Sequence, residues 1–416
     1  MRRHLLADFP LALGALLLSL YGVAMVYSAG QTDVPTVAAT AYRQQLVWLT
    51  LGLIGAFVAS RASVRLVEWL TPSAFVFTIA LLVLTLIAGT GAGTAAGTKS
   101  WLTIGGVRLG QPAELAKLTV VLLLAKVLAA RKDPPKSLLE LWKPALVVLV
   151  PWVLIMRQPD LGTGIVFIGI FFAMLFWSGV PLPLLILIAS PAVSLILAFN
   201  TSLWGAWFLL LLALVLWYRP FLTEGVALMV ANVAMGVVAP VLWERLAPYQ
   251  RHRLLVFLDP SIDPRASGWH VIQSQVAIGS GGWSGKGFTL GTQKRLAFLP
   301  EQHTDFIFAV VGEELGFLGV TVALLLFLFL LLRAVRVAAR ANDSFSSLIA
   351  FGLASGWLVH VVVNIGMTLN LMPITGIPLP FFSYGGSFML ASWLSIGLLL
   401  RISSEGRGGR VGELAI

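Results

Sequence analysis

Two aspartates in one proline-containing stretch could supply a general base. Asp259 and Asp263 each precede a proline in the segment 258–264, LDPSIDP. The residue before a proline is biased away from helix, so both carboxylates are expected in turns. One interpretation is a pair of Asx-type turns without chemistry. The other is a carboxylate that takes a proton beside an anion site formed by neighbouring basic residues.

A second charged pair lies at the start of a predicted membrane span. Glu114 and Lys117 are three positions apart, which places them on one side of a helix. Ionisable groups at membrane depth are rare and commonly functional. The two side chains could form an ion pair with each other near the interface, or they could face a cavity that opens outward.

Three further residues precede predicted spans and could cap them. Asp160 lies in the segment 158–162, QPDLG, and His303 and Asp305 lie in the segment HTD just before another span. A carboxylate at such a position can accept hydrogen bonds from the first helical amides. Two turns further on, Glu313 and Glu314 are adjacent acids at membrane depth, and such acids require a polar pocket or a partner.

The segment 373–387 is a turn rich in proline and glycine that contains Ser383 and ends in SYGGS. Backbone amides in a glycine-rich turn can cradle an anion. Packing of the loop would explain the same composition.

Composition sets the environment of all these groups. Of 416 residues, 58% are hydrophobic and 11% are charged, too few charges to cover a water-exposed surface. The apolar side chains must therefore face lipid. The absence of cysteine excludes disulfides, thiolate metal sites and a cysteine nucleophile.

The hydrophobic runs predict an all-α polytopic membrane protein of about twelve spans. The expected spans are 9–28, 44–60, 73–88, 113–130, 144–156, 161–178, 182–199, 203–218, 223–243, 306–332, 346–369 and 384–400. Basic residues concentrate in alternate loops when the N-terminus is placed inside the cell, which predicts that both termini are cytoplasmic.

Two loops are expected on the outer side. The segment 244–304 is too long and too apolar for a simple connection, and short helices at the membrane interface are expected within it. The glycine-rich stretch 89–110 forms a second outer loop, with Trp101 as an interface anchor. The tail 401–416 is expected to be short and disordered.

Several motifs, taken in order, resemble the SEDS family of bacterial peptidoglycan glycosyltransferases. They are KSWL (99–102), QPAELAK (111–117), QPDLGT (158–163), DP (263–264), GWH (268–270), QS (273–274), GKG (285–287), LPEQHTDF (299–306) and PLPFFSYGGS (378–387). The segments GTQ (291–293) and FLPE (298–301), with Asp259, resemble the elongation branch, RodA, more than the division branch, FtsW. Family members usually have ten spans, so the segment 181–218 is interpreted as an extra hairpin.

The resemblance implies polymerisation of lipid II into β-1,4 glycan strands at the outer face of the cytoplasmic membrane, during cell elongation. Asp263 matches the essential aspartate of the family and is expected to be the base, or a ligand of a divalent cation such as Mg²⁺ or Mn²⁺. The residues expected to bind substrate are Arg43, Trp101, Glu114, Lys117, Asp160, Arg251, Arg253, Arg265, His303, Asp305 and Ser383, with Lys117 and Arg43 on the pyrophosphate.

The resemblance also implies a partner, a class B penicillin-binding protein whose transpeptidase crosslinks the new strand, and further membrane proteins of the elongation complex; no nucleic acid is expected. Three alternatives stay open: a lipid II flippase, an FtsW-like division polymerase and a secondary transporter. Transporters commonly contain internal repeats, and no repeat is evident in this sequence.

Overall fold

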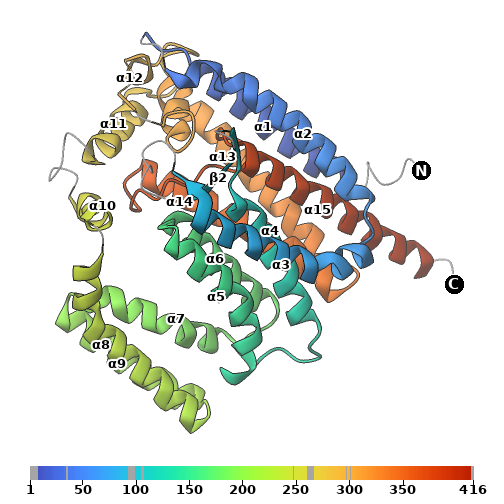
Figure 1. Ribbon diagram of the computed structural model, residues 1–416, viewed down its shortest axis with the longest axis vertical. Coiled ribbons are helices and arrows are strands. Elements are labelled where there is room, and N and C mark those ends of the chain that lie inside the picture. The colour runs from blue at the N-terminus through green and yellow to red at the C-terminus, as the bar shows by residue number, and fades with distance from the viewer. Residues whose placement is uncertain are drawn as a thin grey trace.

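The computed structural model describes residues 8–33, 36–91, 99–104, 107–246, 248–259, 267–296, 298–299 and 301–413. Within these ranges the chain is mostly helical, as the sequence predicts (Figure 1). The long helices are α1 (Phe9–Ala29), α2 (Ala41–Arg61), α3 (Val64–Ala88), α4 (Pro112–Ala129), α5 (Trp142–Arg157), α6 (Leu161–Trp177), α7 (Leu182–Leu197), α8 (Thr201–Tyr218), α9 (Leu222–Arg245), α13 (Ile307–Ala339), α14 (Ser344–Thr368) and α15 (Gly386–Glu413).

Each predicted span coincides with one of these helices. In the described ranges, eight helices are long and apolar enough to cross a membrane, and α6 and α7 are shorter apolar helices. The helices α2 and α4 fall outside both groups; α4 carries three charged residues, Glu114, Lys117 and Lys126. These apolar helices identify the chain as an integral membrane protein. The count of twelve membrane spans stays a prediction.

Side-chain caps define where several helices begin. Asp8, Ser63, Asp160, Asn200 and Asp343 each accept a hydrogen bond from the amide three residues later. Such caps satisfy amides that the helix itself leaves unpaired. The expected cap at Asp160 is confirmed.

The last helix corrects one expectation. We expected the chain to be disordered after residue 400, but α15 continues to Glu413. Arg401 and Glu405 form an ion pair of 2.7 Å one turn apart, and Asn342 donates to the carbonyl of Glu405. Contacts with the α13–α14 connection therefore support the helix beyond the apolar run.

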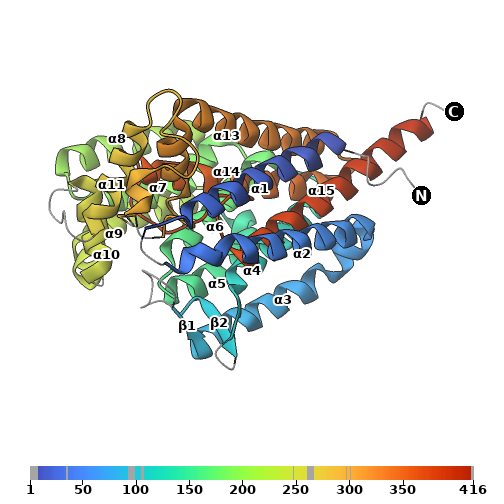
Figure 2. The same cartoon turned by 90° about the horizontal axis from the view of Figure 1, so that it is seen from above.

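The central bundle packs α14 at its middle, against α4, α6 and α13, while α2 packs along α15 and α1 along α13. The helix α1 begins, and α15 ends, at the end of the bundle opposite to the short helices α10 (Pro248–Leu258), α11 (Ser267–Ser280) and α12 (Thr292–Arg295) (Figures 1 and 2). We call the end that carries these short helices the outer end, after the predicted orientation. Three short helices thus lie within the segment 244–304, as expected.

A small antiparallel sheet was not predicted. The outer loop 89–110 contains β1 (Gly89–Thr90), β2 (Trp101–Ile104) and β3 (Val107–Gly110), with β2 in the centre. Trp101 pairs with Thr90 across the first ladder. The sheet places Trp101 beside the end of α3.

The helices α7, α8 and α9 form a unit at the side of the bundle (Figure 1). Leu187, Leu211 and Leu228 make its core, and α7 packs more extensively on α9 than on α8. Asn232 of α9 accepts from Ser194 at 2.6 Å and donates to Ser190 at 2.8 Å, a buried polar contact suited to a lipid environment. The predicted extra hairpin, 181–218, is therefore two members of a three-helix unit.

A backbone kink interrupts α13 at Gly316, where φ is 59° and ψ is −157°. A Cβ atom there would lie 2.4 Å from the amide nitrogen of Gly285 and 2.8 Å from the carbonyl oxygen of Gly282. The segment 282–287 thus packs directly against the kink.

Gly316→Ala should lower the free energy of unfolding by at least about 1–3 kcal/mol, because it combines a strained φ with a backbone clash. The thermal midpoint of the purified protein in detergent measures this. Gly205→Ala is the matched control, since nothing lies within 4 Å of its Cβ position. Equal midpoints for the two variants would contradict the role of the kink.

Candidate functional site: a buried Glu–Lys–His cluster and the outer rim

Glu114 and Lys117 form an ion pair in the first turn of α4. Pro112 occupies the first helical position, where its missing amide hydrogen costs nothing, and Glu114 lies near the positive end of the helix dipole. The Nζ atom of Lys117 is 2.8 Å from Oε2 of Glu114, and both side chains are buried. The ion pair that the spacing allowed is present.

His360 of α14 is the third member of this cluster. Nζ of Lys117 lies 2.8 Å from Nε2 of His360, and an ammonium can only donate, so Nε2 is the acceptor. The proton of a neutral imidazole is then on Nδ1, which donates to the carbonyl of Pro378 at 2.9 Å. Phe388 stacks on the His360 ring at 4.5 Å and presents its face to Nζ of Lys117 at 5.0 Å.

The cluster forms part of the lining of a small cavity of about 40 Å³ between α4, α6, α14 and α15. The rest of the lining is mostly apolar, from Val121, Val166, Ile170, Leu353 and Trp357. Ligand pockets usually measure roughly 300–1,000 Å³, so this volume suits water but not a sugar. The ion pair is therefore present and lines a small cavity, while the outward opening of that cavity stays a prediction.

Asp160 joins three elements at the outer end. Its carboxylate accepts from the amide of Thr163 at 3.0 Å and from the hydroxyl of Thr163 at 2.8 Å. The Gln111 side chain donates to the same carboxylate at 3.0 Å, and the Gln111 amide donates to the Ser387 hydroxyl at 3.0 Å. Asp160 therefore caps α6 and also fixes the starts of α4 and α15.

The turn around Ser383 is held by hydrogen bonds within the protein. The Ser383 hydroxyl accepts from the amide of Leu379 at 2.8 Å, and its carbonyl accepts from the Gln45 side chain at 2.9 Å. The amide of Tyr384 donates to the carbonyl of His303, and that of Gly385 donates to Gln45. These amides are satisfied internally, which favours loop packing over anion binding at this turn.

His303 lies against this turn, with its ring 5.4 Å from that of Tyr384. Burial lowers the pKa of His303 despite the opposing effect of Glu301, so the imidazole is neutral at pH 7.

The expected cap by Asp305 is wrong: α13 begins after Phe306 without a side-chain cap. Instead, the carbonyl of Asp305 accepts from Asn364 at 2.9 Å.

The basic candidates lie apart from the buried cluster. Arg43 is exposed at the start of α2, and its Nε donates to the Tyr42 hydroxyl at 3.1 Å. The guanidinium of Arg251 donates to the carbonyls of Glu244 and Leu246, at the end of α9. Neither arginine contacts Lys117 in this structure.

Asp263 and Arg265 lie outside the described residues. Asp259, just after α10, is exposed, and Arg253 lies on α10. Trp101 lies half-buried in the small sheet. Within the ranges that the structure describes, no three His, Cys, Asp or Glu residues come together to hold a metal ion.

The sequence reasoning overlooked His360 and the buried glutamines. His360 lies within the predicted span 346–369, and the argument that singled out Glu114 applies to it equally, because an ionisable group at membrane depth requires a partner. No local pattern indicated Gln45 or its contact with Ser383. That contact joins residues 338 positions apart in the sequence.

Comparison with known proteins identifies the family. The family model described as "Cell cycle protein", whose name joins FtsW, RodA and SpoVE, matches residues 10–212 and 204–408. The chain belongs to this family.

Relatives from the FtsW/RodA/SpoVE family match almost the whole chain. Peptidoglycan glycosyltransferase RodA of Treponema pallidum is 35% identical, covering 96% of this chain and 98% of the relative. Peptidoglycan glycosyltransferase MrdB of Escherichia coli K12 is 34% identical, covering 96% and 94%. Stage V sporulation protein E of Bacillus subtilis is 35% identical, covering 96% of each.

Solved structures of the family agree in fold. A structure described as "Structural coordination of polymerization and crosslinking by a peptidoglycan synthase complex" superposes with a TM-score of 0.71 at 30% identity, over 96% of this chain and 98% of the other. RodA of Thermus thermophilus gives a TM-score of 0.61 at 27% identity, over 95% and 96%. The predicted all-helical family fold is confirmed.

Lys117→Met should destabilise the protein by about 3–5 kcal/mol, because it leaves the Glu114 carboxylate buried without its counter-ion. Adding Glu114→Gln should recover most of this loss, since no buried charge is then unpaired. Thermal midpoints of both variants in detergent test the expectation. A double variant as unstable as the single one would contradict the pairing.

Proposed function

We propose that the protein is a peptidoglycan glycosyltransferase that polymerises lipid II into β-1,4 glycan strands during cell elongation. The observation that carries the proposal is similarity over 96% of the chain to a curated RodA, with 98% of that relative covered. Three local contacts at the outer end support the proposal: Gln111 with Asp160, Glu114 with Lys117, and His303 with the turn that contains Ser383.

The reaction joins two lipid-linked disaccharides. The 4-hydroxyl oxygen of the acceptor GlcNAc attacks C1 of the donor MurNAc, and the bond from C1 to the pyrophosphate oxygen breaks. The hydroxyl proton passes to a base, and undecaprenyl pyrophosphate leaves with the bonding electrons. The chemistry requires a carboxylate near the acceptor and positive charge near the pyrophosphate.

Asp263 is the proposed base, by its match to the essential aspartate of the family. Arg43 is the better placed of the two proposed pyrophosphate contacts, because it is exposed at the outer end. Lys117 is buried and already faces Glu114, His360 and the ring of Phe388. Lys117 therefore contacts pyrophosphate only if the ligand replaces one of these partners.

A lipid II flippase is the second candidate. It accounts for the spans and for a cavity between helices, but it does not require the long outer segment that contains Asp259 and Asp263. A division-specific, FtsW-like polymerase would share the chemistry and differ in the complex it joins.

The proposed orientation places both termini in the cytoplasm and the segment 244–304 outside, where lipid II is polymerised. The proposed partner is a class B penicillin-binding protein. A solved structure of similar fold is described as a complex that coordinates polymerisation and crosslinking, which supports a transpeptidase partner for this chain. Other membrane proteins of the elongation complex are further proposed partners.

Asp263→Asn should reduce polymerisation of labelled lipid II by about a hundredfold or more, because the amide cannot accept the proton. Asp259→Asn, four positions away in the same stretch, is the control and should retain much more activity. Glycan formation by purified protein, resolved on gels, gives both rates. Polymer at the wild-type rate from Asp263→Asn would remove Asp263 from the catalytic role.

A divalent cation bound at Asp263 is proposed as an aid to departure of the pyrophosphate. Chelator should then reduce the polymerisation rate, and added Mg²⁺ or Mn²⁺ should restore it. The assay is the same lipid II polymerisation, repeated with and without the partner. An unchanged rate after chelation and dialysis would refute the cation.

A further inference from the structure

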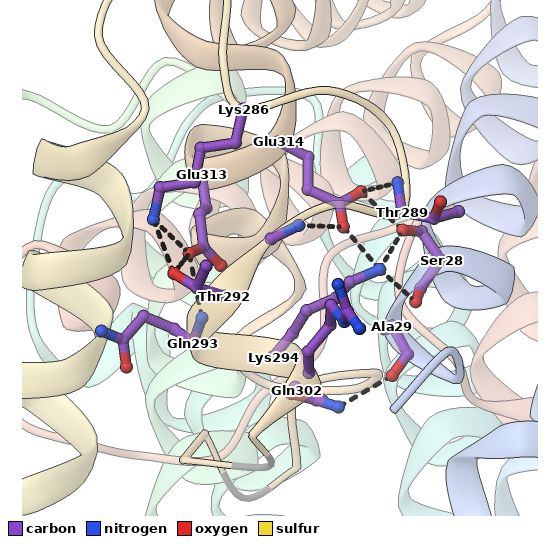
Figure 3. Close-up of polar contacts among 12 residues, drawn as sticks. Ser28, Ala29, Lys286, Thr289, Thr292, Gln293, Lys294, Gln302, Glu313 and Glu314 are labelled. Atoms are coloured by element: carbon purple, nitrogen blue, oxygen red, sulfur yellow. Dashed lines mark hydrogen bonds and ion pairs between the residues drawn. The ribbon is translucent and has the colours of Figure 1, made fainter. Parts of the chain in front are cut away.

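Two adjacent acids on α13 are each paired with a lysine from the outer segment (Figure 3). Glu313 is 2.7 Å from Lys286, and Glu314 is 2.5 Å from Lys294. The two pairs differ in burial, since Lys286 is 27% exposed whereas Lys294 and both glutamates are fully buried. Glu313 and Glu314 were expected to need partners, and both partners come from the outer segment 244–304.

Lys294 uses all three of its ammonium protons. Nζ donates to the carbonyl of Ser28 at 2.6 Å, to the hydroxyl of Ser28 at 2.6 Å, and to Glu314. The Ser28 hydroxyl in turn donates to Glu314 at 2.5 Å. Burial lowers the pKa of Lys294, and Glu314 opposes that effect. One side chain of α12 thus joins the last turn of α1 to the first turns of α13.

The Lys294–Glu314 ion pair adds little net stability, because removing two charges from water costs about as much free energy as their attraction supplies. A buried pair of this kind is better suited to fixing one arrangement among several. The arrangement that it fixes is the position, relative to α1, of the described residues of the segment 292–305 (292–296, 298–299 and 301–305), which we call the returning limb.

Other contacts attach the returning limb to the same end of α1. Gln302 donates to the carbonyl of Ala29 at 2.8 Å, and Arg295 forms an exposed ion pair with Asp33 at 2.9 Å. These bonds are individually modest, and exposed pairs are usually worth under about 1 kcal/mol. Lys294 is the fully buried ion-pair contact of this set.

The returning limb also supports the start of α11. The indole of Trp269 donates to the carbonyl of Phe298 at 2.8 Å and packs edge-on against the Phe298 ring. Asp263 precedes Ser267, the first residue of α11, by four positions. A shift of the limb would therefore move the support of the helix that follows Asp263.

We propose that Lys294 is a positioning residue for polymerisation: it locks the returning limb to Ser28 and Glu314, and through Phe298 and Trp269 it fixes the start of α11, the helix that follows Asp263 in the sequence. The proposal rests on the proposed function for its effect on rate. The position of the limb is measurable without any activity.

The test uses Lys294→Met and the double variant Lys294→Met/Glu314→Gln in lipid nanodiscs. The sequence contains no cysteine, so spin labels at Leu296→Cys on the limb and Val47→Cys on α2 are unique, and both sites are exposed. Pulsed electron spin resonance then reports the spread of distances between limb and bundle. Lipid II polymerisation gives kcat and KM for the same variants without labels.

Both variants should broaden the distance distribution and lower kcat by about tenfold or more, with KM changed little, since misplacement of a reacting group mainly affects the chemical step. The double variant should regain thermal stability, because no buried charge is left unpaired, while its distances stay broad and its kcat stays low. Recovery of stability without recovery of rate separates positioning from folding.

Arg295→Gln is the matched control, because it removes the neighbouring positive charge of the same short helix from an exposed pair. Arg295→Gln should leave the distance distribution narrow and the polymerisation rate within about twofold of the wild-type rate. A narrow distribution in the double variant, or a wild-type kcat for it, would overturn the role of Lys294. A wild-type protein that forms no polymer would refute the proposed function instead. The measured distances would still show whether Lys294 holds the returning limb in place.

Discussion

The structure depends on one constraint, which is that a charge buried among lipid-facing helices must have a partner within reach. Two glutamates at the outer end, Glu114 and Glu314, are each paired with a buried lysine and a further polar side chain. In the first case the third member is His360, and in the second it is Ser28. Each set joins elements that are remote in the sequence, so the charges determine which helix ends lie together.

These two sets hold different parts of the outer end. The Glu114–Lys117–His360 cluster reaches Pro378 and so connects α4 and α14 with the turn before α15. The Lys294–Glu314–Ser28 set connects α1 and α13 with the returning limb of the long outer segment. Between them, Asp160 and Gln111 align the starts of three helices. The resulting rim is held by hydrogen bonds and ion pairs on the bundle side, while Asp259, on the segment side, is exposed.

Much of this architecture could be predicted from the sequence, because hydrophobic length and basic residues report directly on membrane spans. The twelve helices and the cap at Asp160 followed from local patterns. The small sheet did not, since strands of two to four residues carry little periodicity. The continuation of α15 past residue 400 depends on contacts with the α13–α14 connection, which no local pattern reveals.

The candidate site was predictable in its residue types and less so in its contacts. Spacing was sufficient for the Glu114–Lys117 pair, because one helix holds both residues. The partners of Glu313 and Glu314 come from the long segment, and His360 comes from a helix over 240 positions away in the sequence. Asp305 shows the opposite error: its position before a helix suggested a cap, but α13 begins without one.

The central claim is that the protein makes glycosidic bonds. The most direct measurement is incubation of the purified protein with lipid II in detergent, where no leaflets exist, with mass spectrometry of both products. The account predicts β-1,4 glycan chains, and one undecaprenyl pyrophosphate released for each bond formed. Intact lipid II in that assay, together with movement of lipid II across the bilayer of proteoliposomes, would contradict the claim and favour a flippase.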